Sequence, residues 1–213
     1  VTAWHRHEIA GGRVESAAAL PAPDGGRDDL FLLVRRVVNG RVRRYVEVME
    51  AGIAEDAADT AECFFVDSGL SYHGQPVSKV AGLDHLEGET VAVLANGAVQ
   101  TEKVVQNGEI ALDAPASVVH AGLPFTSVLE TMPLANVGDG ASETSKKRVS
   151  GVQLRLYRSL GFSAGTRGGV ERQSFRRVGD KTDTPPDLFT GDRKVSLSAP
   201  WDVTSCVRIE QDQ

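Results

Sequence analysis

The sequence has few of the residues and patterns that mark disulfide-rich, metal-ribbon or membrane proteins. Only two of its 213 residues are cysteines, Cys63 and Cys206, and they form no C-x-x-C pair. Both lie beside apolar residues, which predicts two reduced core thiols, although a single bridge between them stays open. No apolar run approaches the roughly 20 residues needed to span a bilayer, so no membrane anchor is expected.

The common catalytic motifs are also missing. The chain contains no G-x-S-x-G, no H-E-x-x-H and no G-x-x-x-x-G-K-[ST], and no G-x-G-x-x-G stands between a strand and a helix. The glycine-rich stretch from Gly165 to Gly169 is flanked by strand-like segments, which favours a hairpin loop over a phosphate-binding loop. We therefore expect no enzyme activity, no catalytic residues and no cofactor.

An excess of basic charge is absent too. The net charge is −6, so the overall electrostatics give no reason to expect tight binding to nucleic acid. Hydrophobic residues make up 41% of the chain and charged residues 24%, which are ordinary values for a globular protein. A length of 213 residues allows one large domain or two small ones.

What the sequence does contain is a period of two, broken by glycine-rich turns. Three Asn-Gly pairs, Asn39-Gly40, Asn96-Gly97 and Asn107-Gly108, each lie between β-rich runs. Asn-Gly favours the type I′ turn of a hairpin, because both central residues must adopt positive φ. The runs 30–38 and 42–49 are the clearest predicted hairpin. The pattern predicts an all-β fold of antiparallel sheets.

The spacing of these runs predicts two regions. Residues 63–124 are expected to form a small antiparallel β-barrel insert, and residues 1–62 and 125–213 a second, β-sandwich-like antiparallel region built from the two flanking segments. Within the barrel, 63–66 is predicted to be a short buried strand closed by a turn at 67–69. The polar stretch 136–145 is the best linker or surface loop, and a helix over 142–159 is the alternative to a strand there.

The histidines are weak candidates for metal ligands. His5 and His7 have the spacing of one strand face, but no third ligand is evident near them. His85 has two local acidic neighbours, Asp84 and Glu87, within the segment GLDHLEGE. The same segment fits a turn that leads into a strand, with Gly82 and Gly88 permitting positive φ. We favour the structural interpretation of His85 and expect no metal site.

Basic clusters are the remaining candidates for function. They comprise Arg35, Arg36, Arg43, Arg44, Lys146, Lys147 and Arg148. Charged side chains on strands discourage unwanted edge pairing, so solvated strand faces are the simplest explanation. Subunit contacts are the next interpretation, because arginine is enriched at interfaces. Contact with DNA is a minority interpretation, since no aromatic residues alternate with these clusters.

Three stretches carry a resemblance to a known family: GLDHLEGE (82–89), ASVVHAGLPF (116–125) and LFTGD (188–192). With the segments around them, nearly the whole chain resembles the tail tube or nozzle subunit of short-tailed bacteriophages and prophages, also termed a stabilisation protein. Residues 65–124 also resemble the small β-barrel insert of ubiquitin-activating enzymes, as a shared shape and not a shared activity.

The resemblance implies a structural virion protein of the phage tail, assembled in the host bacterial cytoplasm. Its partners would be other tail subunits in a ring, hexameric by resemblance, through which DNA passes during ejection without tight binding. The chain would be the C-terminal portion of a longer subunit, and on its own we expect a monomer. The alternative is a non-catalytic carbohydrate- or receptor-binding β-module of a phage tail, although aromatic residues are only 6% of the chain.

Overall fold

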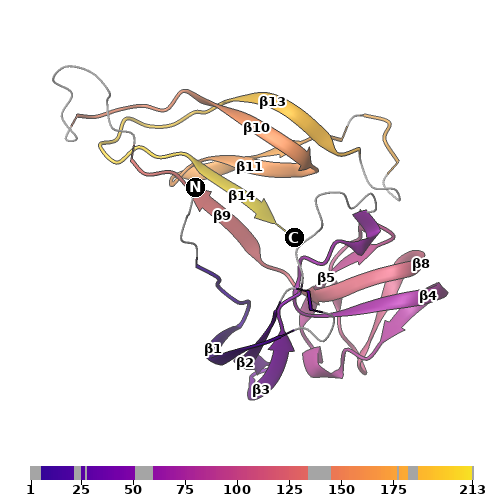
Figure 1. The fold of residues 1–213 in the computed structure, drawn as a ribbon. Coiled ribbons are helices and arrows are strands. Elements are labelled where there is room, and N and C mark those ends of the chain that lie inside the picture. The colour runs from indigo at the N-terminus through magenta and orange to yellow at the C-terminus, as the bar shows by residue number, and fades with distance from the viewer. Residues whose placement is uncertain are drawn as a thin grey trace. The chain divides into compact units, whose positions relative to one another are not determined.

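The computed structural model describes residues 6–21, 25–26, 28–50, 60–133, 145–176, 178–181 and 187–212. Its helices are two single turns of 3-10 helix, η1 (Thr60–Glu62) and η2 (Asp84–Leu86). All strand pairs are antiparallel, so the predicted all-β class is confirmed. The strands are β1 (Gly12–Leu20), β2 (Asp29–Val38), β3 (Arg41–Val48), β4 (Asp67–Ala81), β5 (Thr90–Ala95), β6 (Ala98–Val99), β7 (Lys103–Val104), β8 (Glu109–Leu123), β9 (Thr126–Glu130), β10 (Gly151–Ser159), β11 (Gly161–Thr166), β12 (Gly169–Ser174), β13 (Phe189–Ser196) and β14 (Arg208–Asp212) (Figure 1).

The described chain forms two compact units. The first runs to Phe125, and the second comprises Thr126–Lys181 and Pro186–Asp212. The predicted grouping of residues 1–62 with 125–213 differs from this division, because the N-terminal strands contact the segment that follows them. For example, the Asn39 amide donates to Glu89 Oε1 at 2.6 Å, and the Ala10 amide donates to Asp67 Oδ2 at 2.6 Å.

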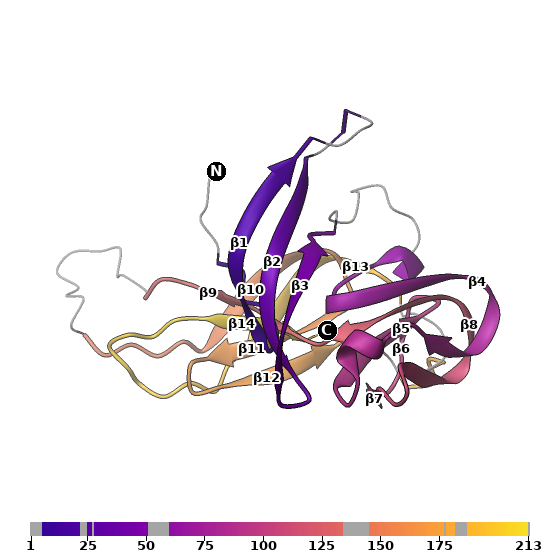
Figure 2. The ribbon, with the colours of Figure 1, turned by 90° about the horizontal axis from the view of Figure 1, so that it is seen from below.

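The N-terminal strands form their own three-stranded sheet, in the order β1-β2-β3 (Figure 2). The predicted hairpin is present as β2 and β3, with Asn39 at φ 46° and Gly40 at φ 69° in its turn. Strand β1 was not predicted, and its pairing with β2 shifts register between Val14 and Ser16, which makes Glu15 the extra residue of a bulge. The sheet is therefore built mostly from a hairpin that the local sequence specifies.

The remainder of the first unit is a five-stranded sheet in the order β4-β8-β5-β6, with β7 paired to β5. Its core is a cluster of small and branched aliphatic side chains that includes Val91, Val93 and Val119. The other two Asn-Gly turns have the expected positive φ, at Asn96 and Asn107. Among the described strands β4 does not pair with β6, so the expected closed barrel is seen as an open sheet.

The longest strands of this sheet differ from the prediction. Residues 63–66 are not a strand, and β4 begins at Asp67, where a turn was expected. The reason is a register shift between Asp67 and Leu70, with Ser68 at φ 51°, which places a turn-like conformation inside a continuous strand. A pattern that resembles a turn is here an irregularity within the β4–β8 ladder.

The second unit contains two sheets, a pair β10-β13 and a four-stranded sheet β12-β11-β14-β9. Val152 of β10 and Val195 of β13 share one apolar cluster with Phe162, Ala164 and Ile209 of the other sheet. This sandwich-like arrangement comes from residues after 125 without the N-terminal flank. Residues 151–159 are a strand, so the alternative helix over 142–159 is wrong in its described part; most of the predicted linker 136–145 lies outside the described residues.

Cys206 is buried, Cys63 is half-buried, and no disulfide joins the two. Among the described residues, no helix is both long and apolar enough to cross a membrane.

Candidate functional site

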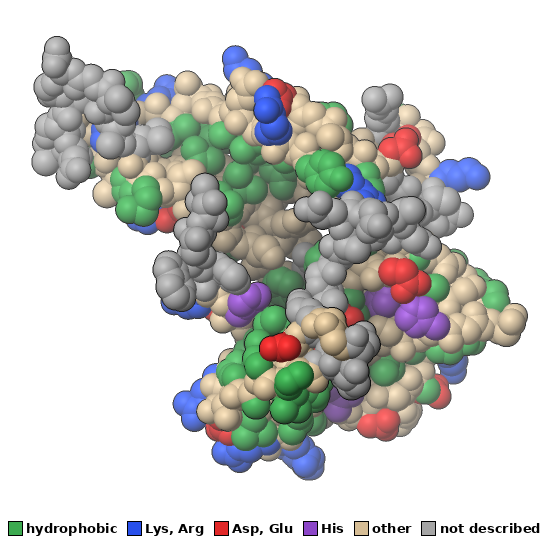
Figure 3. Space-filling view, viewed as in Figure 1, with side chains coloured by type: hydrophobic (Ala, Val, Ile, Leu, Met, Phe, Trp, Pro, Cys, Tyr) green, Lys and Arg blue, Asp and Glu red, His purple; other side chains and the backbone are tan. Residues whose placement is uncertain are grey.

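One face of the β1–β2–β3 sheet carries large hydrophobic side chains that remain exposed. Paired residues of neighbouring strands point to the same side, so Leu33 lies beside Val46 and Val37 lies beside Val42. Val46 is 72% exposed. The exposed aliphatic residues of this face, called the apolar face below, are Leu20, Leu33, Val37, Val42, Val46 and Val48. Figure 3 shows hydrophobic side chains gathered over the region of β1–β3, with Lys and Arg at its margin.

The opposite face of the same sheet is packed against the rest of the first unit. Val34 and Val38 are buried there, and the Tyr45 hydroxyl donates to the His85 carbonyl at 3.1 Å. Among the described residues of the first unit, the sheet is thus anchored through this side. A sheet packed on one side is normally polar on the other, so an aliphatic outer face is unusual for a free surface.

A band of four charged residues crosses the middle of the apolar face: Arg13, Glu15, Arg35 and Arg44. Arg44 Nε lies 2.7 Å from Glu15 Oε2, and Arg13 Nη2 lies 3.7 Å from Glu15 Oε1. Arg35 pairs with Arg44 in register and is half-buried. The hydrogen bond from Arg44 lowers the pKa of Glu15, against an opposing effect of desolvation. Arg13 and Arg44 pair with the Glu15 carboxylate and Arg35 lies next to Arg44, so the band is net positive.

Arg36, predicted as a surface contact, is instead a buried residue. Its side chain is 1% exposed, and Nε and Nη2 each lie 2.7 Å from a carboxylate oxygen of Glu47. Its Nη1 donates to the Ala10 carbonyl. The alternation of β2 places Arg36 on the inward face beside Val34 and Val38, so it ties the sheet together and is not available to a partner.

Arg43 lies on the same inward side of the sheet, at its exposed end. It lines a cleft of about 330 Å³ together with Arg41 and Tyr45 from β3. Asp84, His85 and Glu87 from the segment after β4 line the cleft as well, so basic and acidic groups oppose each other. Arg43 is therefore separated from Arg44, which lies on the apolar face.

The second basic cluster lies in the second unit. Lys146 and Arg148 are exposed, and Lys147 is half-buried between them. Lys147 forms a β-bridge with Asp202, with two backbone hydrogen bonds of 2.8 Å. This bridge fixes the backbone and leaves the side chains of Lys146 and Arg148 directed to solvent.

The segment GLDHLEGE is a connection that holds several turns together. His85 Nε2 lies 2.8 Å from the Ser68 carbonyl, and the His85 ring packs edge-on against Tyr45. Glu87 accepts hydrogen bonds from the amides of Asn107 and Gly108 at 3.0 and 2.8 Å, which caps that turn. The contacts agree with the structural interpretation of His85. His7 is exposed, and His5 lies outside the described residues.

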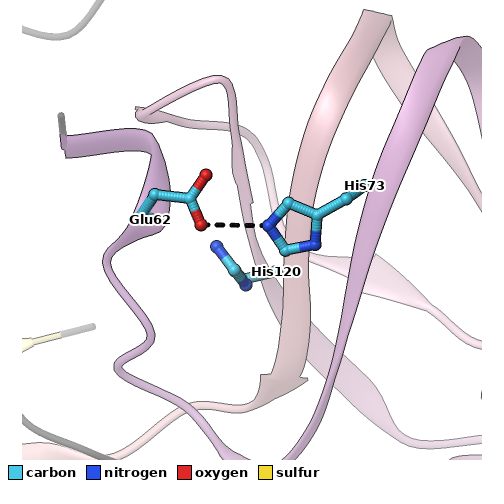
Figure 4. Close-up of side chains that lie close together, drawn as sticks. All are labelled: Glu62, His73 and His120. Carbon is cyan, nitrogen blue, oxygen red and sulfur yellow. Dashed lines mark hydrogen bonds and ion pairs between the residues drawn. The ribbon is translucent and has the colours of Figure 1, made fainter.

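The structure brings together three residues that the sequence pattern did not single out: Glu62, His73 and His120 (Figure 4). Glu62 Oε2 lies 3.0 Å from His73 Nε2, and the ring centroids of His73 and His120 are 5.8 Å apart. Burial lowers the pKa of His120, so its imidazole is neutral near pH 7. The sequence shows only that the two histidines lie in separate strand-like segments. Their proximity becomes visible once the register of β4 with β8 is known.

Aromatic residues that could serve a glycan site are scattered. Trp201 and Tyr157 of the second unit are 66% and 67% exposed, and Trp4 lies outside the described residues. Comparison with known proteins adds no assignment: no protein-family model matches the sequence, and no curated protein matches it significantly.

Proposed function

We propose that this chain is a non-catalytic assembly module whose apolar face packs against a second copy of the chain. The apolar face is the observation that carries the proposal. Fully burying a valine or leucine side chain contributes about 1.5–3 kcal/mol, so the six aliphatic residues of this face represent a large unused driving force. Exposed apolar patches of this kind mark interaction sites.

The size of the sheet fits a subunit contact. Its central strand has ten residues. At about 3.3 Å per residue and about 4.8 Å between strands, the face measures about 33 by 14 Å, or about 460 Å² before side-chain relief is counted. A standard interface takes about 800 Å² from each partner, so this face would supply more than half of one side.

Charge favours a copy of the same chain as the occupant. The band of Arg13, Arg35 and Arg44 is net positive, whereas the chain as a whole carries −6. If the apolar face, with its basic band, meets a different, acidic surface of the next copy, the contact is head-to-tail. When the rotation between successive copies closes on itself, such a contact builds a ring.

Strand β1 offers a second feature suited to assembly. It forms one edge of the sheet, and all nine of its residues are exposed. Its half from Ser16 to Leu20 contains no charge, whereas β3, at the other edge, contains Arg41, Arg43 and Arg44. An exposed uncharged edge can accept a further strand, and charged residues discourage such pairing.

A ring of such modules corresponds to the tail tube or nozzle of short-tailed phages, which the sequence resembles. We place the protein there, in the virion tail, as a subunit around a channel through which DNA passes without tight binding. The number of six subunits in the ring is taken from the resemblance to this family. The apolar face lies within the described residues, so this chain alone should associate, in contrast to the monomer expected from its sequence.

Sedimentation velocity over a range of protein concentrations tests the proposal. The wild-type chain should self-associate reversibly, and Val46→Glu should weaken the association at least about tenfold, the effect of about 1.4 kcal/mol. Val99→Glu is the matched control, because Val99 is 69% exposed on β6, away from the apolar face. A monomer at every concentration, or equal association of both variants and wild type, would contradict the proposal.

A further inference from the structure

The ladder between β4 and β8 places two histidines on one face of the sheet. Ser71 pairs with His120, and His73 pairs with Val118, so His73 and His120 are diagonal neighbours on the same side. The single turn of η1 supplies Glu62 from a third segment. Ligand atoms of Glu62, His73 and His120 all lie within 4.8 Å of one another.

The surroundings of His120 fix the orientation of its ring and the position of its ring proton. The residue is 3% exposed, and the Phe64 ring packs edge-on against it, with centroids 5.6 Å apart. Nδ1 lies 2.7 Å from Ser71 Oγ, and Nε2 lies 2.9 Å from the Ala61 carbonyl. A carbonyl only accepts hydrogen bonds, so Nε2 carries the proton and the Ser71 hydroxyl donates to Nδ1.

The Ser71 hydroxyl can also accept a hydrogen bond, and this permits the other tautomer of His120. With the proton on Nδ1 and donated to Ser71 Oγ, Nε2 presents a lone pair toward η1, where Glu62 is located. A metal-bound histidine usually donates its second ring nitrogen to such an outer partner. The site therefore contains a ligand and the group that would orient it.

We propose that Glu62, His73 and His120 bind one divalent transition-metal ion, with Zn²⁺ as the best match. Two imidazoles and one carboxylate are a known zinc donor set, and it leaves a fourth position for water. In a tetrahedral site with bonds of about 2.0–2.1 Å, the ligand atoms lie about 3.4 Å apart. The side chains of His73 and Glu62 are 51% and 56% exposed, so both can move by the small distance required.

The ion would join η1 to the β4–β8 ladder. Binding exchanges the His120–Ala61 hydrogen bond and the Glu62–His73 ion pair for three metal bonds. The Ala61 carbonyl lies 2.9 Å from His120 Nε2, so η1 must shift to admit the ion, while the backbone of β4 and β8 stays in place. His120 sets the position of the ion because it is buried and oriented. The other two ligands close over it from the surface.

Isothermal titration of the full chain with Zn²⁺ tests the site, together with the variants His73→Gln and Glu62→Gln. Both residues are exposed, so the variants should fold, which circular dichroism checks. We expect one ion per chain and an affinity reduced about tenfold or more in each variant, since even outer-sphere changes cost about 10–100-fold. His7→Gln is the control, an exposed histidine outside the cluster, and should bind like wild type.

A second readout is specific to the geometry. Long-range nitrogen–proton NMR correlations of the imidazoles should show His120 protonated on Nε2 without metal and on Nδ1 with Zn²⁺. Absence of saturable zinc binding, unchanged affinity in His73→Gln and Glu62→Gln, or a His120 tautomer that does not change when zinc binds would each overturn the proposal. Loss of binding in His7→Gln would assign the ion to another site and would overturn it as well.

Discussion

The buried ion pair between Arg36 and Glu47 allows the sharpest test of the N-terminal sheet. Arg36→Met keeps most of the aliphatic volume of the side chain and removes its charge and donors. The change leaves the Glu47 carboxylate without two hydrogen bonds of 2.7 Å and the Ala10 carbonyl without its donor. A half-buried charge then remains without its partner.

Breaking a buried pair by removing one partner costs about 3–5 kcal/mol. The Glu47 side chain is 19% exposed, so water reaches the carboxylate in part, and we expect a loss near the lower limit, about 3 kcal/mol. Replacing both members, in Arg36→Met/Glu47→Leu, removes the unpaired charge. The double variant should recover at least about half of the loss.

Hydrogen exchange of the amides of β2 measures this loss where it occurs, because the chain has two units and a global transition would mix them. Arg44→Met is the control in the same sheet. Its ion pair with Glu15 is solvated, with the Arg44 side chain 58% exposed, and its loss should change exchange far less. An Arg36→Met effect no larger than that of Arg44→Met would refute the assignment of Arg36 as a structural residue.

Three further predictions concern charge, packing and DNA. Desolvation raises the pKa of Asp67, so ionisation of this carboxyl destabilises the fold as pH rises through the folded pKa. Asp67→Asn keeps an acceptor for the Ala10 amide and should raise the urea midpoint at pH 7. Below about pH 3 the acid is protonated in both the folded and the unfolded state, so the substitution should not raise the midpoint there. A Cβ on Gly122 would lie 2.8 Å from the Asp67 carbonyl oxygen of β4, so Gly122→Ala should cost about 1–3 kcal/mol in thermal or urea unfolding, and an unchanged stability would contradict the close approach. Duplex DNA should bind negligibly at physiological salt in a fluorescence anisotropy assay; strong, salt-dependent binding that is lost on neutralising Arg43 and Arg44 would place those residues at a channel wall instead.

Local sequence signals specified the turns and the central hairpin of this fold well. Each Asn-Gly pair requires a backbone conformation that few other pairs adopt, so the three turns could be predicted without knowing their surroundings. Strand β1 carries no such signal. All of its residues are exposed, so no alternation of buried and exposed positions marks it, and alanine is not a strong strand former.

The candidate sites depend on pairing between distant segments, which one sequence does not reveal. Arginine is usually a surface residue, and Arg36 can be buried because Glu47 pairs with it across the hairpin. In the same way, Glu62, His73 and His120 meet because the register of β4 with β8 brings their segments together. A shift of one residue would turn either histidine to the opposite face.

We propose that the β1–β2–β3 sheet assembles copies of this chain. Hydrogen–deuterium exchange, measured at protein concentrations below and above the association midpoint, distinguishes this sheet from the other strands. Amides of β1 at the open edge, together with those of β2 and β3 beneath the apolar face, should become protected as copies associate, while those of β6 stay unchanged. Protection confined to other strands, or exchange that does not depend on concentration, would contradict it.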